Sequence, residues 1–174
     1  MKRVILVGFM GSGKTTLGKK LSNSMGVKFI DSDKEIELKY KKTIGVLFGE
    51  KGETGFREIE TEFIEELKNQ EEFVLATGGG MPCFNHAMER LNAIGCTFYL
   101  ERTSKELAHR LTNAKSKRPL IDGLNDEDLL DFIVERLNDR KSFYKSANVT
   151  LNREEQNVES ISKIILLLDQ AQKS

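Results

Sequence analysis

The chain has 174 residues, 39% hydrophobic and 31% charged, which is ordinary for one globular domain with a substantial core. Its 27 lysines and arginines balance 27 aspartates and glutamates, so no net charge favours nucleic acid or a membrane surface as a partner. Every apolar run is far shorter than the roughly 20 residues that cross a bilayer, so we expect no transmembrane helix. Cys83 and Cys96 form no CxxC pair, which favours reduced thiols in a cytoplasmic protein. The isolated His86 and His109 are typical of helix surfaces rather than of a metal site.

Short apolar runs alternate with longer helical patterns along the sequence. Residues 4–7 form the first predicted strand, a run that is too short for a signal peptide and leads into a glycine-rich loop rather than a cleavage site. The other predicted strands cover residues 27–30, 73–76, 96–100 and 147–151. Predicted helices cover residues 15–25, 44–48, 104–111, 127–141 and 158–168, and another carries Phe56, Ile59, Phe63, Ile64 and Leu67 on one face. This alternation predicts βαβ units, and hence a single α/β domain over residues 1–174 with a parallel sheet covered on both faces.

The loop after the first predicted strand reads GFMGSGKT at residues 8–15, which matches the phosphate-binding pattern G-x-x-x-x-G-K-[ST]. Glycines let the backbone N–H groups point at phosphate oxygens, and the start of the next helix adds positive potential. Lys14 can reach the β- and γ-phosphates, and the Thr15 hydroxyl can hold Mg²⁺. The alternative is a glycine-rich turn beside a chance lysine, but the motif lies between a predicted strand and a predicted helix, as a nucleotide site requires. The residues predicted to bind a nucleoside triphosphate here are Gly11, Ser12, Gly13, Lys14, Thr15 and Thr16.

Two aspartates, Asp31 and Asp33, follow the second predicted strand. Ligands of parallel sheets bind at the carboxyl ends of strands, so these carboxylates are expected near the bound triphosphate. One could serve Mg²⁺ and the other could accept a proton from an attacking hydroxyl. The alternative is that Asp33 merely caps the start of a helix, a common position for aspartate.

Arg57 and Glu60 are three residues apart on a predicted helix and therefore share a face, whereas Phe56 and Ile59 are expected to point toward the core. An arginine in this position can bind a carboxylate through two parallel hydrogen bonds, with Glu60 fixing its orientation. The alternative is an exposed ion pair that contributes a few tenths of a kcal/mol.

Three consecutive glycines, Gly78, Gly79 and Gly80, follow the third predicted strand. They exceed what a turn requires and suit a backbone that a ligand must approach closely, although a simple flexible loop is the alternative.

Residues 113–125 are rich in polar, basic and turn-forming residues, which predicts a mobile lid. Arg118 in this lid could stabilise the charge that develops during phosphoryl transfer, although solvated loop charge is the default interpretation. Arg140 lies near the end of its predicted helix, where it could equally be a favourable charge at the helix C-terminus.

Taken together, these motifs resemble those of the shikimate kinase family, in order and spacing, from residue 4 to about residue 165. The family pattern combines a P-loop, a D-x-D after the second strand, GExxFRxxE, a GGG turn, R-P-L in the lid and a late arginine. The corresponding segments here are residues 8–15, 31–33, 52–60, 78–80 and 118–120, with Arg140 as the late arginine.

The resemblance implies a P-loop kinase with a short lid and a five-stranded parallel sheet in the order 2-3-1-4-5. It implies transfer of the γ-phosphoryl group of ATP to the 3-hydroxyl of shikimate, a step toward aromatic amino acids, with Mg²⁺ as cofactor. The implied catalytic residues are Lys14, Asp33 and Arg118. The implied shikimate-binding residues are Asp33, Arg57, Glu60, Gly78, Gly79, Gly80 and Arg140, from a helical segment at about 33–61 and beyond. Thr15 and Asp31 would serve Mg²⁺, while Arg110, Arg118 and Arg153 would join the P-loop in binding ATP.

Two rival acceptors remain open from sequence. A kinase of the same fold could act on gluconate or on a nucleoside monophosphate, since an acidic sugar would need similar arginines. A nucleotide-dependent switch would need a guanine-reading N-K-x-D element, which the sequence lacks. We expect a cytoplasmic monomer that uses small-molecule substrates and has no nucleic acid or membrane partner.

Overall fold

A computed structural model describes residues 3–113, 121 and 123–171. Its sheet consists of β1 (Arg3–Val7), β2 (Lys28–Asp31), β3 (Phe73–Ala76), β4 (Cys96–Leu100) and β5 (Val149–Leu151). All neighbouring strands pair in parallel, in the order β2-β3-β1-β4-β5. The predicted sheet and its strand order are confirmed.

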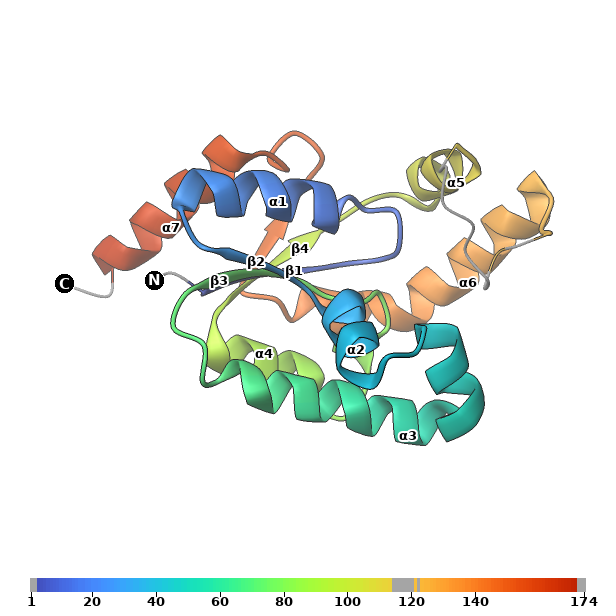
Figure 1. Cartoon of the computed structure of the whole chain (residues 1–174). Coiled ribbons are helices and arrows are strands. Elements are labelled where there is room, and N and C mark those ends of the chain that lie inside the picture. The colour runs from blue at the N-terminus through green and yellow to red at the C-terminus, as the bar shows by residue number, and fades with distance from the viewer. Residues whose placement is uncertain (1–2, 114–120, 122, 172–174) are drawn as a thin grey trace.

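Helices cover both faces of this sheet (Figure 1). Helices α1 (Lys14–Met25) and α7 (Val158–Ala171) lie on one face. Helices α3 (Ile44–Leu67), α4 (Ala87–Ile94) and α6 (Asp126–Lys145) lie on the other. At the end where the strands finish lie α2 (Ser32–Tyr40), α5 (Ser104–Thr112) and the 3₁₀ turn η1 (Met81–Cys83).

The two faces of β1 bury different side chains. Val4 and Leu6 pack with Leu17 and Leu21 of α1, and Ile5 and Val7 belong to the core formed with α3, α4 and α6. Because both faces are covered, the strand is apolar at every buried position instead of alternating with polar residues. Both cores therefore hold the carboxyl end of β1, and the loop that follows it, at a fixed place.

Helix α4 was not predicted, and α2 was expected only as part of the helical segment at about 33–61, because neither has a long apolar period. In α2 the only buried apolar residue is Ile36, and α4 spans just 8 residues. The two helices predicted around residues 44–67 form one element that is interrupted at Gly52, whose φ of 67° and ψ of −178° are not helical. The predicted helix at 127–141 extends to Lys145.

Two minor features complete the fold. Cys83 and Cys96 are both free and buried. Within the described ranges 3–113, 121 and 123–171, the helices lack the length and apolarity that a bilayer crossing requires.

Candidate active site

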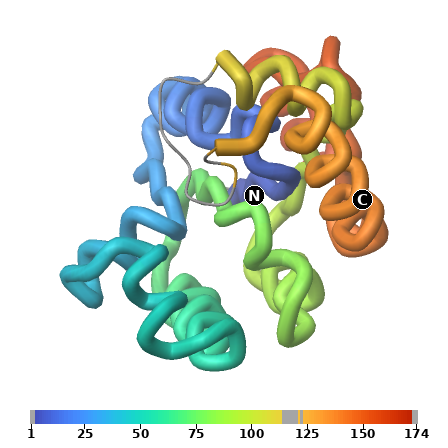
Figure 2. The backbone as a smooth tube through the Cα atoms, turned by 90° about the vertical axis from the view of Figure 1, so that its right-hand side faces the viewer, coloured from blue at the N-terminus to red at the C-terminus, as the bar shows by residue number. Residues whose placement is uncertain are grey.

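A cleft of about 960 Å³ opens where the strands end. Viewed toward this end, the segment from α2 to α3 lies on one side and the segment from α5 to α6 on the other (Figure 2). The predicted site residues that line the cleft are Gly11, Gly13, Lys14, Thr15, Thr16, Asp31, Asp33, Arg57, Glu60, Gly78, Gly79, Gly80, Arg110, Arg140 and Arg153. Ser12, within the loop, is buried and does not line the cleft. Arg118 and most of the predicted lid lie outside the described residues.

The P-loop is shaped by its glycines. Gly13 has a φ of 107°, in the left-handed region that favours glycine, and it is the N-cap of α1. Lys14 is buried and donates hydrogen bonds to the carbonyl oxygens of Gly8 at 2.7 Å and Phe9 at 2.9 Å. Its ammonium group is therefore held at the centre of the loop, beside backbone N–H groups and the positive end of a helix. This is an anion site in both charge and geometry.

Thr15 and Asp31 meet at the edge of the P-loop. The Thr15 hydroxyl donates to Asp31 Oδ2 at 3.0 Å. Asp31 also caps α2, because its Oδ1 accepts a hydrogen bond from the Lys34 N–H at 3.4 Å. The alternative in which Asp33 is the helix cap is therefore wrong, and Asp33 lies in the first turn of α2.

Asp33 sits beside the glycine turn. Burial, followed by the charge of Asp31, raises the pKa of Asp33, while the nearby Lys14 ammonium opposes this shift. The Ser32 hydroxyl accepts a hydrogen bond from the Gly78 N–H at 2.7 Å, which fixes the turn against α2. Asp33 is therefore a carboxyl group of increased basicity in a defined position.

The three glycines leave room for functional side chains. A Cβ atom at position 78 would lie 2.4 Å from Asp33 Oδ1, and one at position 80 would lie 3.0 Å from Arg57 Nη2. Gly79 is also held, because its carbonyl oxygen accepts a hydrogen bond from the Tyr144 hydroxyl of α6. These contacts disfavour the flexible-loop alternative and explain why the turn carries no side chains.

Arg57 and Glu60 form a buried ion pair. The Arg57 Nη1 donates to Glu60 Oε2 at 2.6 Å, and their side chains are only 10% and 6% exposed, so the alternative of an exposed pair is wrong. Burial raises the pKa of Glu60 to about 7, although the charge of Arg57 opposes this. Phe56 and Ile59 are buried, as predicted.

Arg140 reaches the same cleft from α6. Its Cζ lies 5.8 Å from the centroid of the Phe9 ring. Because α6 continues to Lys145, Arg140 lies more than one turn from the helix end, and its interpretation as a C-terminal helix charge is wrong. Arg57 and Arg140 thus present two guanidinium groups to one cleft, and they are hereafter called the carboxylate clamp after the role predicted for them.

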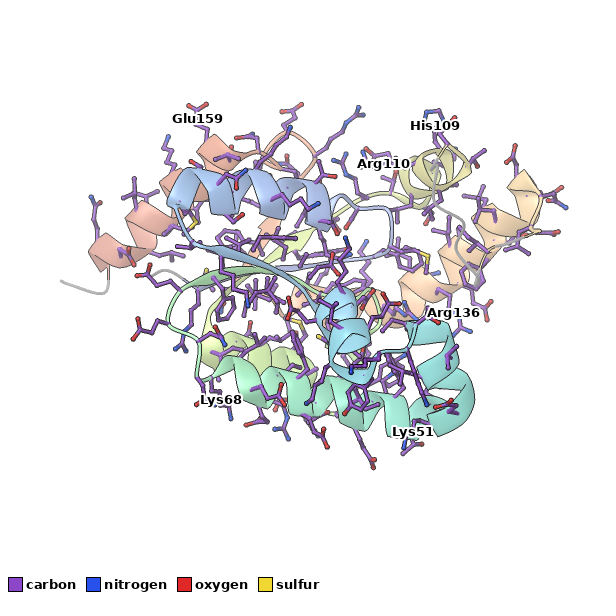
Figure 3. The ribbon with its side chains drawn as sticks, in the orientation of Figure 1. Lys51, Lys68, His109, Arg110, Arg136 and Glu159 are labelled. Atoms are coloured by element: carbon purple, nitrogen blue, oxygen red, sulfur yellow. The ribbon has the colours of Figure 1, made fainter. Side chains whose placement is uncertain are left out.

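The opposite wall carries Arg110 and Arg153. Arg110 Nε donates to the Gly11 carbonyl at 2.7 Å, and Figure 3 shows its helix beside the P-loop. Arg153 Nη1 lies 3.6 Å from Glu106 Oε1. The backbone N–H of Thr103 keeps the pKa of Glu106 below its usual value, so this partner is a firm negative charge. His109 is exposed on α5, and His86 is exposed at the start of α4.

Sequence reasoning missed several residues around these groups. Arg102 and Glu106 line the cleft, and Phe84 and Glu53 contact the Arg57 guanidinium. Glu53 could have been found from sequence, because it lies four residues before Arg57, a spacing that brings two side chains together on a helix. Phe84 lies 27 residues after Arg57, and no local pattern links the two.

Comparisons with known proteins agree with this geometry. A family model described as Shikimate kinase matches residues 10–169. The shikimate kinase of Bacteroides fragilis is 47% identical over 148 residues, which cover 85% of this chain and 83% of the relative. The crystal structure of shikimate kinase from Bacteroides thetaiotaomicron matches with a TM-score of 0.88 at 41% identity, covering 97% of this chain and 98% of that one. The shikimate kinase of Acinetobacter baumannii, solved in complex with shikimate, matches with a TM-score of 0.80 at 35% identity, covering 99% and 95% of the two chains. The chain therefore belongs to the shikimate kinase family, whose reaction is the phosphorylation of shikimate by ATP.

Proposed function

We propose that this chain phosphorylates the 3-hydroxyl of shikimate, with ATP on the P-loop side of the cleft and the acid on the side of α2 and α3. The observation that carries the proposal is the convergence of Lys14, Asp33 and the carboxylate clamp on one cleft. Lys14 lies close enough to Asp33 for its charge to lower the pKa of that carboxyl group. A phosphate-binding cation and a basic carboxylate side by side are what transfer to a hydroxyl group requires.

On the nucleotide side, the triphosphate would lie along Gly11, Gly13 and Lys14, with Thr16 behind them. Ser12, within the loop, would contribute through its backbone. Lys14 would exchange its carbonyl partners for β- and γ-phosphate oxygens, which are stronger acceptors because they are charged. Arg110 and Arg153 would border the base, and Arg118 would approach the phosphates from a lid at about 113–125.

Mg²⁺ fits beside Thr15 and Asp31. Magnesium in kinases is bound by one or two protein oxygens together with phosphate oxygens and water, not by an all-protein cage. Thr15 Oγ1 and Asp31 Oδ2, 3.0 Å apart at the mouth of the P-loop, supply such a pair of oxygens. When bound, the ion would neutralise charge on the phosphates.

On the acid side, Asp33 would accept the proton of the attacking hydroxyl, and its raised pKa makes it a better base than an ordinary aspartate. The carboxylate clamp would hold the substrate carboxylate, with Glu60 orienting Arg57. The hydroxylated ring of shikimate could approach the backbone closely at Gly78, Gly79 and Gly80.

The acceptor is tested by an ADP-release assay with shikimate, gluconate, AMP and CMP. We expect turnover with shikimate to exceed that with the other three by orders of magnitude. A nucleoside monophosphate or gluconate that outperforms shikimate would overturn the assignment and restore one of the rival kinases.

We further propose that the chain is a cytoplasmic monomer in which one kinase domain spans residues 1–174 and the segment at about 33–61 binds the acid. The equal numbers of acidic and basic residues support small-molecule substrates rather than nucleic acid or membrane partners. Size-exclusion chromatography with light scattering should give a mass near 19.7 kDa, and a stable dimer mass would contradict the monomer.

A further inference from the structure

We propose that Glu53 neutralises the outer edge of the Arg57 guanidinium while the cleft is empty, and that the carboxylate of the substrate displaces it. Glu53 would therefore be a specificity-determining residue that sets the affinity for the acid. This inference rests on the proposed role of Arg57 in binding the substrate carboxylate.

The guanidinium of Arg57 is enclosed on several sides. Its Cζ lies 3.9 Å from the ring centroid of Phe84, 5.5 Å from that of Phe56 and 6.0 Å from that of Phe48. The Gly80 backbone closes another side, since a Cβ there would lie 3.0 Å from Nη2. The plane of the guanidinium is thus fixed by packing, and a carboxylate can reach it only along the edge.

Two glutamates share that edge. Arg57 Nη1 donates to Glu60 Oε2 at 2.6 Å, and Arg57 Nη2 donates to Glu53 Oε1 at 3.2 Å. Arg57 Nε is buried without a hydrogen-bond partner. An incoming substrate carboxylate would be the third negative charge on one guanidinium. Arg140 would share the substrate carboxylate, but three carboxylates around the Arg57 guanidinium still repel one another, which favours the release of one resident glutamate.

Burial decides which glutamate yields. The Glu60 side chain is only 6% exposed, so separating it from Arg57 would leave a buried carboxyl group without its partner. The Glu53 side chain is 56% exposed, its contact with Arg57 is longer, and water is available as soon as it turns away.

The backbone around Glu53 also favours its release. Glu53 directly follows Gly52, where α3 is interrupted by a non-helical conformation with φ of 67°. No atom lies within 4 Å of the position that a Cβ on Gly52 would occupy, so space surrounds the break. Lys51, directly before the break, is exposed on the outer side of α3 (Figure 3). Glu53 therefore begins the second half of α3 without the packing that holds Glu60.

Competition between Glu53 and the substrate predicts an unusual result, namely tighter substrate binding after loss of a native ion pair. Glu53→Gln keeps an oxygen that accepts from Nη2 but removes the competing charge. We expect the dissociation constant of shikimate, measured by calorimetry on the full chain without ATP, to fall roughly two- to fivefold, the range of an exposed ion pair. The KM for shikimate should fall by a similar factor, whereas kcat and the KM for ATP should change little.

Glu58→Gln is the matched control, because Glu58 is exposed on the same half of α3 and its removal changes net charge equally. It should leave shikimate affinity within about 1.5-fold of the parent, since a solvated charge away from the clamp is screened. Glu60→Gln should act in the opposite direction and weaken shikimate binding, because Arg57 loses its buried partner.

The outcomes separate the inference from the function on which it rests. If Arg57→Ala weakens shikimate binding but Glu53→Gln does not tighten it, the displacement of Glu53 is wrong and the carboxylate clamp stands. If Glu58→Gln tightens shikimate binding as much as Glu53→Gln, the effect comes from the net charge of the protein and not from competition for Arg57, and the inference fails. If Arg57→Ala has no effect on shikimate affinity, the clamp itself is overturned.

Discussion

The two sides of the cleft are built in different ways. On the nucleotide side, the polar surface comes mainly from backbone of one contiguous loop, and Lys14 bonds to two carbonyl oxygens of that same loop. On the acid side, the polar groups are side chains from separate elements: Asp33 from α2, Arg57 and Glu60 from α3, and Arg140 from α6.

This difference has energetic consequences. Backbone donors need no partner to hold them in place, because the fold of the loop orients them. The acid side must bury charges, and it does so by pairing Arg57 with Glu60 at 2.6 Å. We therefore expect substitutions on the nucleotide side to change catalysis directly, and substitutions on the acid side to act through partners.

The largest expected effect is at Asp33, the acid-side residue whose pKa also responds to Lys14 of the nucleotide side. Asp33→Asn removes the proton acceptor but keeps the size of the side chain, so kcat should fall by about 10²- to 10⁴-fold. ATP affinity should change little. Steady-state kinetics with a nucleotide-binding titration checks both, and a variant with full kcat would remove Asp33 from the mechanism.

The pH profile sharpens this prediction. Because burial raises the pKa of Asp33 above its ordinary 3.8, kcat/KM for shikimate should rise as the pH increases through this elevated pKa, when Asp33 loses its proton. The control is the pH profile of the residual activity of Asp33→Asn. The carboxyl group of the substrate can still titrate in that variant, whereas the carboxyl group of Asp33 is gone. If kcat/KM falls at low pH in Asp33→Asn as it does in the parent, the fall arises from a group other than Asp33.

Lys14→Met tests the nucleotide side. It removes a cation from the β- and γ-phosphates, so kcat should fall by about 10²- to 10³-fold, the usual cost of losing one transition-state donor. Thermal unfolding should show that the variant is folded. Activity near that of the parent at saturating Mg-ATP would contradict the P-loop assignment.

Arg57→Ala and Arg140→Ala test the carboxylate clamp. Charge-assisted hydrogen bonds contribute about 1.5–3 kcal/mol each, so the KM for shikimate should rise about ten- to a hundredfold in each variant, with the KM for ATP nearly constant. Lysine at either position should rescue only in part, because it lacks the planar fork.

The methyl ester of shikimate is the control substrate for the clamp, since it lacks the negative charge. The parent enzyme should strongly prefer the acid, and both alanine variants should lose most of that preference. An ester that reacts as well as the acid in the parent would mean that no clamp exists.

The smallest expected effect compares two glycines. Gly80→Ala puts a methyl group 3.0 Å from Arg57 Nη2 without backbone strain, so shikimate KM should rise several-fold while stability stays close to that of the parent. Gly26→Ala meets no atom within 4 Å but forces alanine to a φ of 68°, so it should cost about 1–2 kcal/mol of stability and leave kinetics unchanged. Chemical denaturation and steady-state kinetics distinguish the two, and an unchanged KM for shikimate in Gly80→Ala would contradict the predicted contact with Arg57.

The sequence predicted those parts of the molecule whose pattern lies within a few adjacent residues. All five strands were predicted, because a sheet covered on both faces gives continuous apolar runs such as β1. The P-loop was predicted because its chemistry is contained in 8 adjacent residues. The periodicity of the sequence did not reveal helix α2, because Ile36 alone supplies its buried apolar contact, and only the family resemblance placed a helical segment there.

The acid side could be predicted only as a set of candidates. Neither the burial of Arg57 and Glu60 nor the stacking of Phe84 on Arg57 follows from spacing, because both depend on how α3 packs beside the turn after β3. The role of Asp33 as cap or base was also ambiguous in sequence, since aspartate is common in both, and only the hydrogen bond of Asp31 to Lys34 identifies the cap.

The close fit of the glycine turn against α2 and α3 has an evolutionary consequence. A side chain at position 78 would collide with the Asp33 carboxylate, and one at position 80 would crowd the Arg57 guanidinium, so a change in the turn disturbs the functional group beside it. A lineage that shifted this cleft toward a larger or uncharged acceptor would need paired substitutions, each harmful by itself. Positions 33 and 78, and positions 57 and 80, should therefore co-vary across distant members of the fold, which makes the preference for the acid resistant to gradual drift.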